Sequence, residues 1–89
     1  MNKIEIIEQL GKEGTDKITN FKGVISSVSF DLYGCAQYWL TPKANKDMII
    51  PEGKWMDHGR IKLGKRIVSI EEVQVDDGDG PESKGPPIR

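Results

Sequence analysis

The sequence predicts a small all-β protein, an SH3-like, strongly bent antiparallel barrel of about five strands. The longest stretch rich in β-branched and aromatic residues, residues 19–42, carries turn signals before and within it, which is typical of a hairpin. Short apolar segments separated by glycine-marked turns recur from Glu13 to Ile70. This spacing favours a small barrel, and an OB-like barrel, which usually needs more residues, is the alternative.

The N-terminal segment, Lys3 to Leu10, is interpreted as a short helix. Its apolar residues recur at spacings of three and four, which fits one helical stripe. The run Ile4-Glu5-Ile6 also fits a strand, and so short a segment leaves intrinsic propensity undecided. The polar residues 13–19 are predicted to form an edge strand, where charge discourages pairing with other chains.

The first central strand is predicted from the alternation of apolar and polar residues over residues 24–32. The apolar positions on one face are Val24, Val28, Phe30 and Leu32. Turns are predicted on either side of the strand, with Gly23 and Gly34 as structural turn residues. Gly34 ends Asp-Leu-Tyr-Gly, so we expect it to adopt a positive φ.

The second central strand is predicted over residues 35–41, with Tyr38 and Leu40 on one face and Trp39 with Cys35 on the other. The pattern leaves open which face is the core. A long loop over residues 43–53 should follow, then a strand at 54–57 closed by a turn containing Asp57 and Gly59. Residues 60–63 and 65–70 are predicted to form two further short apolar segments, separated by Gly64.

The predicted domain organisation is one small β-barrel domain over residues 1–75, with a flexible acidic, proline- and glycine-rich tail over residues 76–89. The tail has almost no large apolar side chain with which to offset its ordering entropy. A chain of 89 residues has a small core, and its one cysteine and one histidine are too few for an internal disulfide or for a metal cage of the usual cysteine and histidine kind. Self-association is the remaining way to stabilise it.

The charge balance weakly disfavours nucleic acid as a partner. Thirteen lysines and arginines against fourteen acidic residues give a net charge of −1, whereas nucleic-acid-binding domains usually present a basic face. The sequence lacks a transmembrane-length apolar run and a convincing signal peptide, so no membrane partner is expected. The single cysteine fits a reducing compartment, and we expect a cytoplasmic protein.

Three motifs resemble those of a group of small phage and prophage proteins. The motifs are a Lys-x-Thr-x-Phe-x-Gly-Val segment, a Phe-Asp-Leu-Tyr-Gly-Cys-x-Gln turn and a Trp-Phe-Asp-x-x-Arg-Leu closing strand. In this chain the corresponding positions are Lys17, Thr19, Phe21, Gly23, Val24, Phe30 to Cys35, Gln37, Trp55, Asp57, Arg60 and Ile61. Met56 stands where the group has an aromatic residue. The resemblance implies an SH3-like barrel and a mobile-element origin in a bacterial host, and no particular activity.

Catalytic, cofactor-binding and metal-binding residues are not predicted, and the chain is expected not to be an enzyme. Cys35 with His58 and Asp57 would supply the residue types of a thiol hydrolase, but a small buried cysteine is the ordinary explanation for a strand position. Asp31, Asp57 and His58 are too dispersed for a metal site. Asp57 is interpreted as a turn residue that also pairs with Arg60.

The candidate interaction surface consists of Tyr33, Trp39 and Trp55, because one small barrel can bury only one face of its central strands. We expect a homo-oligomer, with a dimer favoured, and an unknown protein partner. The leading hypothesis is a non-catalytic phage- or prophage-type accessory protein that acts by protein–protein interaction. The alternatives are a nucleic-acid-binding barrel that uses lysines with stacked aromatics, and a cysteine-dependent enzyme that uses Cys35.

Overall fold

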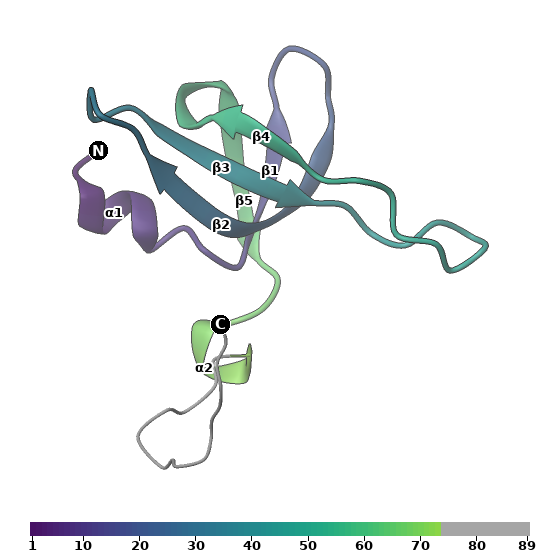
Figure 1. Cartoon of the computed structure of the whole chain (residues 1–89). Helices are drawn as coiled ribbons and strands as arrows, with labels where there is room; N and C mark the ends of the chain where they lie inside the picture. Colours follow the sequence, from purple (N-terminus) through teal and green to yellow (C-terminus); the bar gives the residue numbers. More distant parts are fainter. Residues whose placement is uncertain (74–89) are drawn as a thin grey trace.

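Five antiparallel strands form one sheet in the order β4-β3-β2-β1-β5 (Figure 1). The elements along the chain are α1 (Lys3–Ile7), β1 (Lys12–Asp16), β2 (Lys22–Phe30), β3 (Ala36–Thr41), β4 (Lys54–Asp57), the 3₁₀ helix η1 (His58–Arg60), β5 (Ile61–Arg66) and α2 (Ile70–Val73). The computed structural model describes residues 1–73, so the predicted tail and the last two residues of the predicted domain lie outside the described residues. The all-β class with five strands is confirmed.

Helix α1 begins at a capping box, which explains how five residues form a helix. The side chain of Asn2 accepts a hydrogen bond from the backbone N–H of Glu5 at 2.8 Å, and the Glu5 carboxylate accepts one from the N–H of Asn2 at 2.8 Å. Ile6 is buried, so tertiary packing adds to this local stabilisation. The helical interpretation of the N-terminal segment is confirmed.

Strand β2 contains a bulge that reverses its alternation of faces. Ile25 pairs with Leu40, but the next paired residue, Ser27, is opposite Trp39, which leaves Ser26 as an extra residue. Val24 therefore lies on the opposite face from Ile25, whereas Val28 shares the inner face with its partner Tyr38. The predicted grouping of Val24 with Val28 is wrong for this reason.

The core lies between α1 and the inner face of the sheet. It consists of Ile6, Ile25, Ala36, Tyr38, Leu40 and Ile61, with Leu10, Phe21, Val28, Phe30, Met56 and Leu63 packed against it. The hydroxyl of Tyr38 is within 3.4 Å of the carbonyl oxygen of Ile6, and burial raises the pKa of Tyr38. The face of β3 that carries Tyr38 and Leu40 is thus the core face. Leu32, which was predicted to share one face of the first central strand with Val24, Val28 and Phe30, is 91% exposed in the turn that follows β2.

Strand β1 lies inside the sheet, between β2 and β5, so its prediction as an edge strand is wrong. Its polar composition is tolerated because Gly14 leaves space for side chains of the core. A Cβ atom at Gly14 would lie 2.9 Å from Cγ2 of Ile61 and 3.1 Å from Cδ2 of Leu40. The edges of the sheet are instead β4 and β5.

The turn between β1 and β2 lies earlier than predicted. The backbone reverses over residues 17–21, where Asn20 has a φ of 66°, and the N–H of Asp16 donates to the carbonyl oxygen of Phe21 at 2.8 Å. Gly23 is a buried residue of β2 that pairs with Gly14. The prediction of Gly23 as a turn residue is therefore wrong. A glycine is needed at this strand position because the backbone of Thr41 approaches too closely for a side chain.

The C-terminal part of the described chain is one strand and one helical turn. Strand β5 continues through Gly64, which was predicted to divide two pieces, and Ile70 begins α2 instead of extending a strand. The guanidinium of Arg66 donates to the carbonyl oxygens of Leu10 at 2.6 Å and Glu8 at 2.9 Å. These bonds fasten the end of β5 to the residues that follow α1.

Candidate interaction surface

Trp39 and Trp55 form an aromatic pair on the outer face of the sheet. They are directly opposite each other in the β3–β4 ladder, and their rings meet edge to face with centroids 5.4 Å apart and planes at 69°. The alternation of β3 buries Tyr38 and therefore directs Trp39 away from the core. Trp55 is 45% exposed, so much of the pair faces solvent.

The residues around the tryptophan pair are small or polar. Ser27 is opposite Trp39 on the β2 side, and Gln37 with Asp57, two positions along the β3–β4 ladder, forms the next pair on the same face. Gly53 is buried beside the pair, and a Cβ atom there would lie 2.6 Å from Cε2 and Nε1 of Trp39. The incoming β4 backbone therefore packs against one side of the Trp39 indole and holds it in place.

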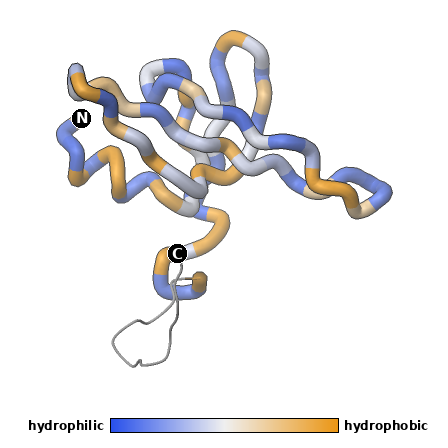
Figure 2. Tube along the Cα trace, viewed as in Figure 1, coloured by the Kyte–Doolittle hydropathy of each residue, from blue (hydrophilic) through white to orange (hydrophobic). Residues whose placement is uncertain are grey.

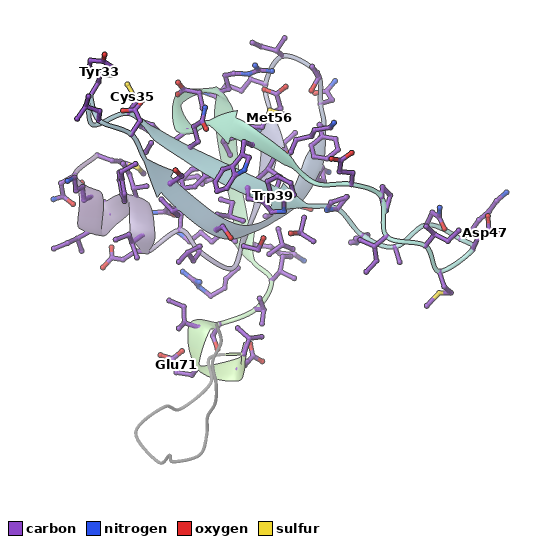
Figure 3. The ribbon with its side chains drawn as sticks, viewed as in Figure 1. Tyr33, Cys35, Trp39, Asp47, Met56 and Glu71 are labelled. Carbon is purple, nitrogen blue, oxygen red and sulfur yellow. The ribbon has the colours of Figure 1, made fainter. Side chains whose placement is uncertain are left out.

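The loop between β3 and β4, residues 43–53, forms an extended arm with Asp47 labelled at its tip (Figure 3). Asn45 closes the tip: its side-chain oxygen accepts hydrogen bonds from the N–H groups of Asp47 at 2.8 Å and Ile49 at 3.0 Å. The N–H of Asn45 also donates to the carbonyl oxygen of Ile49 at 2.8 Å. This turn leaves three consecutive apolar residues exposed, Met48, Ile49 and Ile50. Figure 2 shows this apolar stretch beside the polar tip.

Tyr33 is separate from the tryptophan pair. It is 85% exposed in the β2–β3 turn, at the opposite end of the hairpin from the arm (Figure 3). Gly34 has a φ of 84°, as predicted, and Asp31 holds the turn by accepting from the N–H groups of Tyr33 and Cys35 at 2.9 Å each. The structure therefore brings together two of the three residues of the predicted surface, Trp39 and Trp55.

Asp57 and Gly59 lie in the predicted turn between β4 and β5. The Asp57 carboxylate accepts a hydrogen bond from the N–H of Gly59 at 2.9 Å and caps η1. The predicted partner of Asp57, Arg60, instead forms a bidentate pair with the buried carboxylate of Asp16, at 2.9 and 2.7 Å. The pairing of Asp57 with Arg60 is thus wrong, because Asp16 accepts both hydrogen bonds from the guanidinium.

The Arg60 guanidinium, with help from the hydroxyl of Thr19, holds the pKa of the Asp16 carboxyl far below its ordinary value. Asp16 is 0% exposed, and the Arg60 guanidinium with the hydroxyl and N–H groups of Thr19 compensates its buried charge. The pair joins the β1–β2 turn to η1 and is structural.

Cys35 and His58 are not brought together as a thiol–imidazole pair. Cys35 is exposed in the β2–β3 turn, which contradicts the expected burial, and the His58 ring meets the ring of Tyr38 edge on at 6.3 Å. Within residues 1–73, no hydrogen bond joins Cys35 to His58, and no three His, Cys, Asp or Glu side chains gather where they could hold a metal ion. None of the helices described is long and apolar enough to cross a membrane.

A group of lysines was missed by the sequence analysis. Lys22 of β2 and Lys62 of β5 both pair with Thr15 of β1, and Lys17 lies beside them around a shallow depression of about 500 Å³. Glu13 lies in the same depression and offsets part of the positive charge. The pairing of β1 with β2 and β5 brings Lys22 and Lys62 together across Thr15, although the two lysines are 40 residues apart in the sequence.

An apolar groove was also missed. It has a volume of about 600 Å³ and lies between α1, the start of β2 and the residues around α2. Its lining is Ile7, Leu10, Gly11, Val24, Ile25, Ser26, Val68, Ser69, Ile70 and Val73. Three separate segments form it, so no local pattern in the sequence could have indicated it.

Comparison with known proteins returned no match to a family model, a curated protein or a solved structure. The fold and its surfaces define the class of this protein: it is a small all-β protein with exposed aromatic and apolar surfaces.

Proposed function

We propose that this chain is a non-catalytic phage- or prophage-type accessory protein that acts by protein–protein interaction and self-association. The observation that carries the proposal is the exposed pair of Trp39 and Trp55 on the outer face of β3 and β4. The motif resemblance to small phage and prophage proteins supports the mobile-element origin.

The tryptophan pair has the properties of a binding hot spot. Tryptophan is enriched among the residues that dominate interface energetics, and both indoles are placed on paired strands. The edge-to-face contact and the packing of Gly53 restrict Trp39 before any partner binds. Binding at this surface would therefore cost little additional side-chain entropy.

Light scattering at micromolar concentration on the wild type and on Trp39→Ala and Trp55→Ala tests this proposal. We expect a dimer for the wild type and a folded monomer for Trp55→Ala, because Trp55 is the more exposed member of the pair. Tyr33→Ala is the matched control, since it removes an exposed aromatic ring at the other end of the hairpin. A wild-type monomer, or equal effects of Tyr33→Ala and Trp55→Ala, would contradict the proposal.

A second candidate function is nucleic-acid binding, which the grouping of Lys17, Lys22 and Lys62 favours. Lysines contact phosphates, and the aromatic pair would provide a surface on which bases stack. A salt titration of binding to generic single-stranded DNA and RNA tests it, because phosphate contacts make affinity fall steeply with salt. Binding that Lys22→Gln and Lys62→Gln weaken would favour this candidate over the first.

A further inference from the structure

We infer that the lysine-lined depression between β1, β2 and β5 binds an anion made of linked phosphate groups, which a free polyphosphate or the backbone of a nucleic acid supplies. The inference goes beyond the proposed function, because the depression lies on β1, β2 and β5 whereas the tryptophan pair lies on β3 and β4. It also differs from the second candidate function, since binding of phosphate groups alone requires neither bases nor aromatic stacking.

The fold concentrates positive charge on one half of the sheet. Strands β2, β1 and β5 are neighbours (Figure 1), and the segments that contain them, residues 12–30 and 60–66, carry seven basic and two acidic side chains, a net charge of +5. The other described residues, 1–11, 31–59 and 67–73, carry four basic and eight acidic side chains, a net charge of −4. The near-neutral net charge of the whole chain therefore conceals a basic half of the sheet, which attracts anions.

Within this half, three lysine side chains line one depression of about 500 Å³. Lys22 and Lys62 are both paired with Thr15, one on either side of β1, and Lys17 lies in the turn that follows β1. In the described part of the chain the only ion pair is that formed by Asp16, so none of the three amines is paired with a carboxylate there. Like charges that are held together in this way repel each other, and a multivalent anion between them offsets the repulsion.

Glu13 borders the three lysines and leaves a net charge of +2 around the depression. It precedes Thr15 by two residues and so lies on the same face of β1. A Cβ atom at Gly64 would lie 3.3 Å from Oε1 of Glu13, so this carboxylate rests against the backbone of β5. Because Glu13 is the one acidic side chain of the depression, removing its charge should strengthen the attraction for an anion.

The turn that presents Lys17 is held in place before any anion binds. The N–H of Lys17 donates to the carbonyl oxygen of Arg60 at 2.8 Å, and its amine donates to the carbonyl oxygen of Gly59 at 3.4 Å. The buried carboxylate of Asp16 accepts a hydrogen bond from the N–H of Thr19 in the same turn at 3.1 Å. An ordered turn loses little conformational entropy when a ligand binds, which favours a binding site over a group of freely solvated lysines.

A second depression extends the basic surface beyond the reach of one phosphate group. Its volume is about 250 Å³, and it shares Glu13 and Lys22 with the first depression while adding Lys43. Thr15 and Asn20 line the first depression and supply a hydroxyl and an amide that can donate to phosphate oxygens. The four lysines therefore suit several linked phosphates, whereas a single carboxylate or phosphate would leave most of them unpaired.

An NMR titration of the isotope-labelled protein with sodium tripolyphosphate tests the site, because this probe has linked phosphates and no base. We expect saturable shifts at the amides of residues 13–22 and 62–64. Lys22→Gln and Lys62→Gln should each weaken binding about fivefold, because each removes one charge contact with phosphate. Lys46→Gln is the matched control, since it removes an exposed lysine on the arm, outside both depressions.

The sign of the charge effect and the source of the phosphates are tested with the same measurement. Glu13→Gln should tighten tripolyphosphate binding about threefold, and weaker binding by this variant would contradict the inference. Tighter binding of a thymidine decanucleotide, with shifts at the same amides, identifies a nucleic acid backbone as the source. Tighter binding of tripolyphosphate identifies a free polyphosphate. Binding of a hexaglutamate peptide as tightly as either anion would overturn the preference for phosphate.

The outcomes separate this inference from the proposed function. If tripolyphosphate causes no saturable shifts, or if Lys46→Gln and Lys22→Gln weaken binding equally, the phosphate site is refuted, and a wild-type dimer still supports the proposed function. Lys22→Gln and Lys62→Gln should keep the oligomeric state of the wild type in light scattering, because neither lysine belongs to the tryptophan pair. A wild-type monomer that binds tripolyphosphate would refute the proposed function and support the phosphate site.

Discussion

Replacing Leu40 by alanine should remove a large part of the stability of this fold. Leu40 is 0% exposed at the centre of the core, where it pairs with Ile25 across the β2–β3 ladder. Its Cδ2 atom also fills the space above Gly14, at 3.1 Å from the position of a Cβ atom there. The side chain on β3 therefore reaches residues of two other strands, β2 and β1, so a small rearrangement of one strand cannot fill the space that it leaves.

The expected loss of unfolding free energy follows from the number of carbon atoms that the substitution of Leu40 removes. Leucine to alanine removes three, and about 0.8 kcal/mol for each gives about 2.4 kcal/mol of transfer free energy. The cavity left behind raises the total to about 3–5 kcal/mol. A domain of this size has a free energy of unfolding of about 4–11 kcal/mol, so a loss of this size should be clearly measurable.

Urea denaturation followed by tryptophan fluorescence measures this loss. Leu32→Ala is the matched control, because it makes the same chemical change at a residue that is 91% exposed. Its effect should stay within about 0.5 kcal/mol. Equal destabilisation by the two substitutions, or a loss below about 1 kcal/mol for Leu40→Ala, would refute the placement of the core.

Gly34→Ala should destabilise the protein by about 1 kcal/mol through its φ of 84° alone, since no atom lies within 4 Å of the added methyl group. Gly14→Ala should lower the free energy of unfolding by about 1–3 kcal/mol, because its methyl group would crowd the core. Urea denaturation of both variants measures the two losses, and a larger loss for Gly34→Ala than for Gly14→Ala would contradict this placement of Gly14. Cys35 should react with iodoacetamide in the native protein without unfolding it, whereas reaction limited by global unfolding would contradict its exposure. In the folded protein the pKa of Asp16 is lower than its ordinary value of 3.8. The stability contributed by its pair with Arg60 is therefore present above pH 3.8 and is lost as the pH falls below that value. Melting temperatures of Asp16→Asn should be lower than wild type at neutral pH and converge with it in acid; a constant difference would argue against the ion pair.

Local chemistry in the sequence determined the β2–β3 turn, the turn after β4 and the start of the N-terminal helix. The capping box at Asn2 and Glu5, the turn at Gly34 and the cap at Asp57 each involve residues within a few positions of one another. Such interactions depend only on neighbouring residues, so a reading of the sequence can identify them. The number of strands and the all-β class follow from the same local signals.

The faces of the central strands were decided by the tertiary structure. The apolar alternation of β2 contains no sign that Ser26 is an extra residue, because two serines in succession fit either register. The bulge is required by the pairing with β3, which places Ile25 rather than Val24 in the core. Tyr38 and Trp39 are both apolar enough to be buried, and only the packing of α1 against one face selects Tyr38.

The surfaces and the buried ion pair depend on residues that are far apart in the sequence. Asp16 and Arg60 are 44 residues apart, and the groove and the lysine group each combine three segments. Strand β1 looked like an edge strand because its own residues are polar, yet β5 pairs with it and encloses it in the sheet. Local patterns in the sequence indicate how polar a segment is. Which segments pair with each other depends on how the whole chain buries its core, and this pairing determines the long-range contacts.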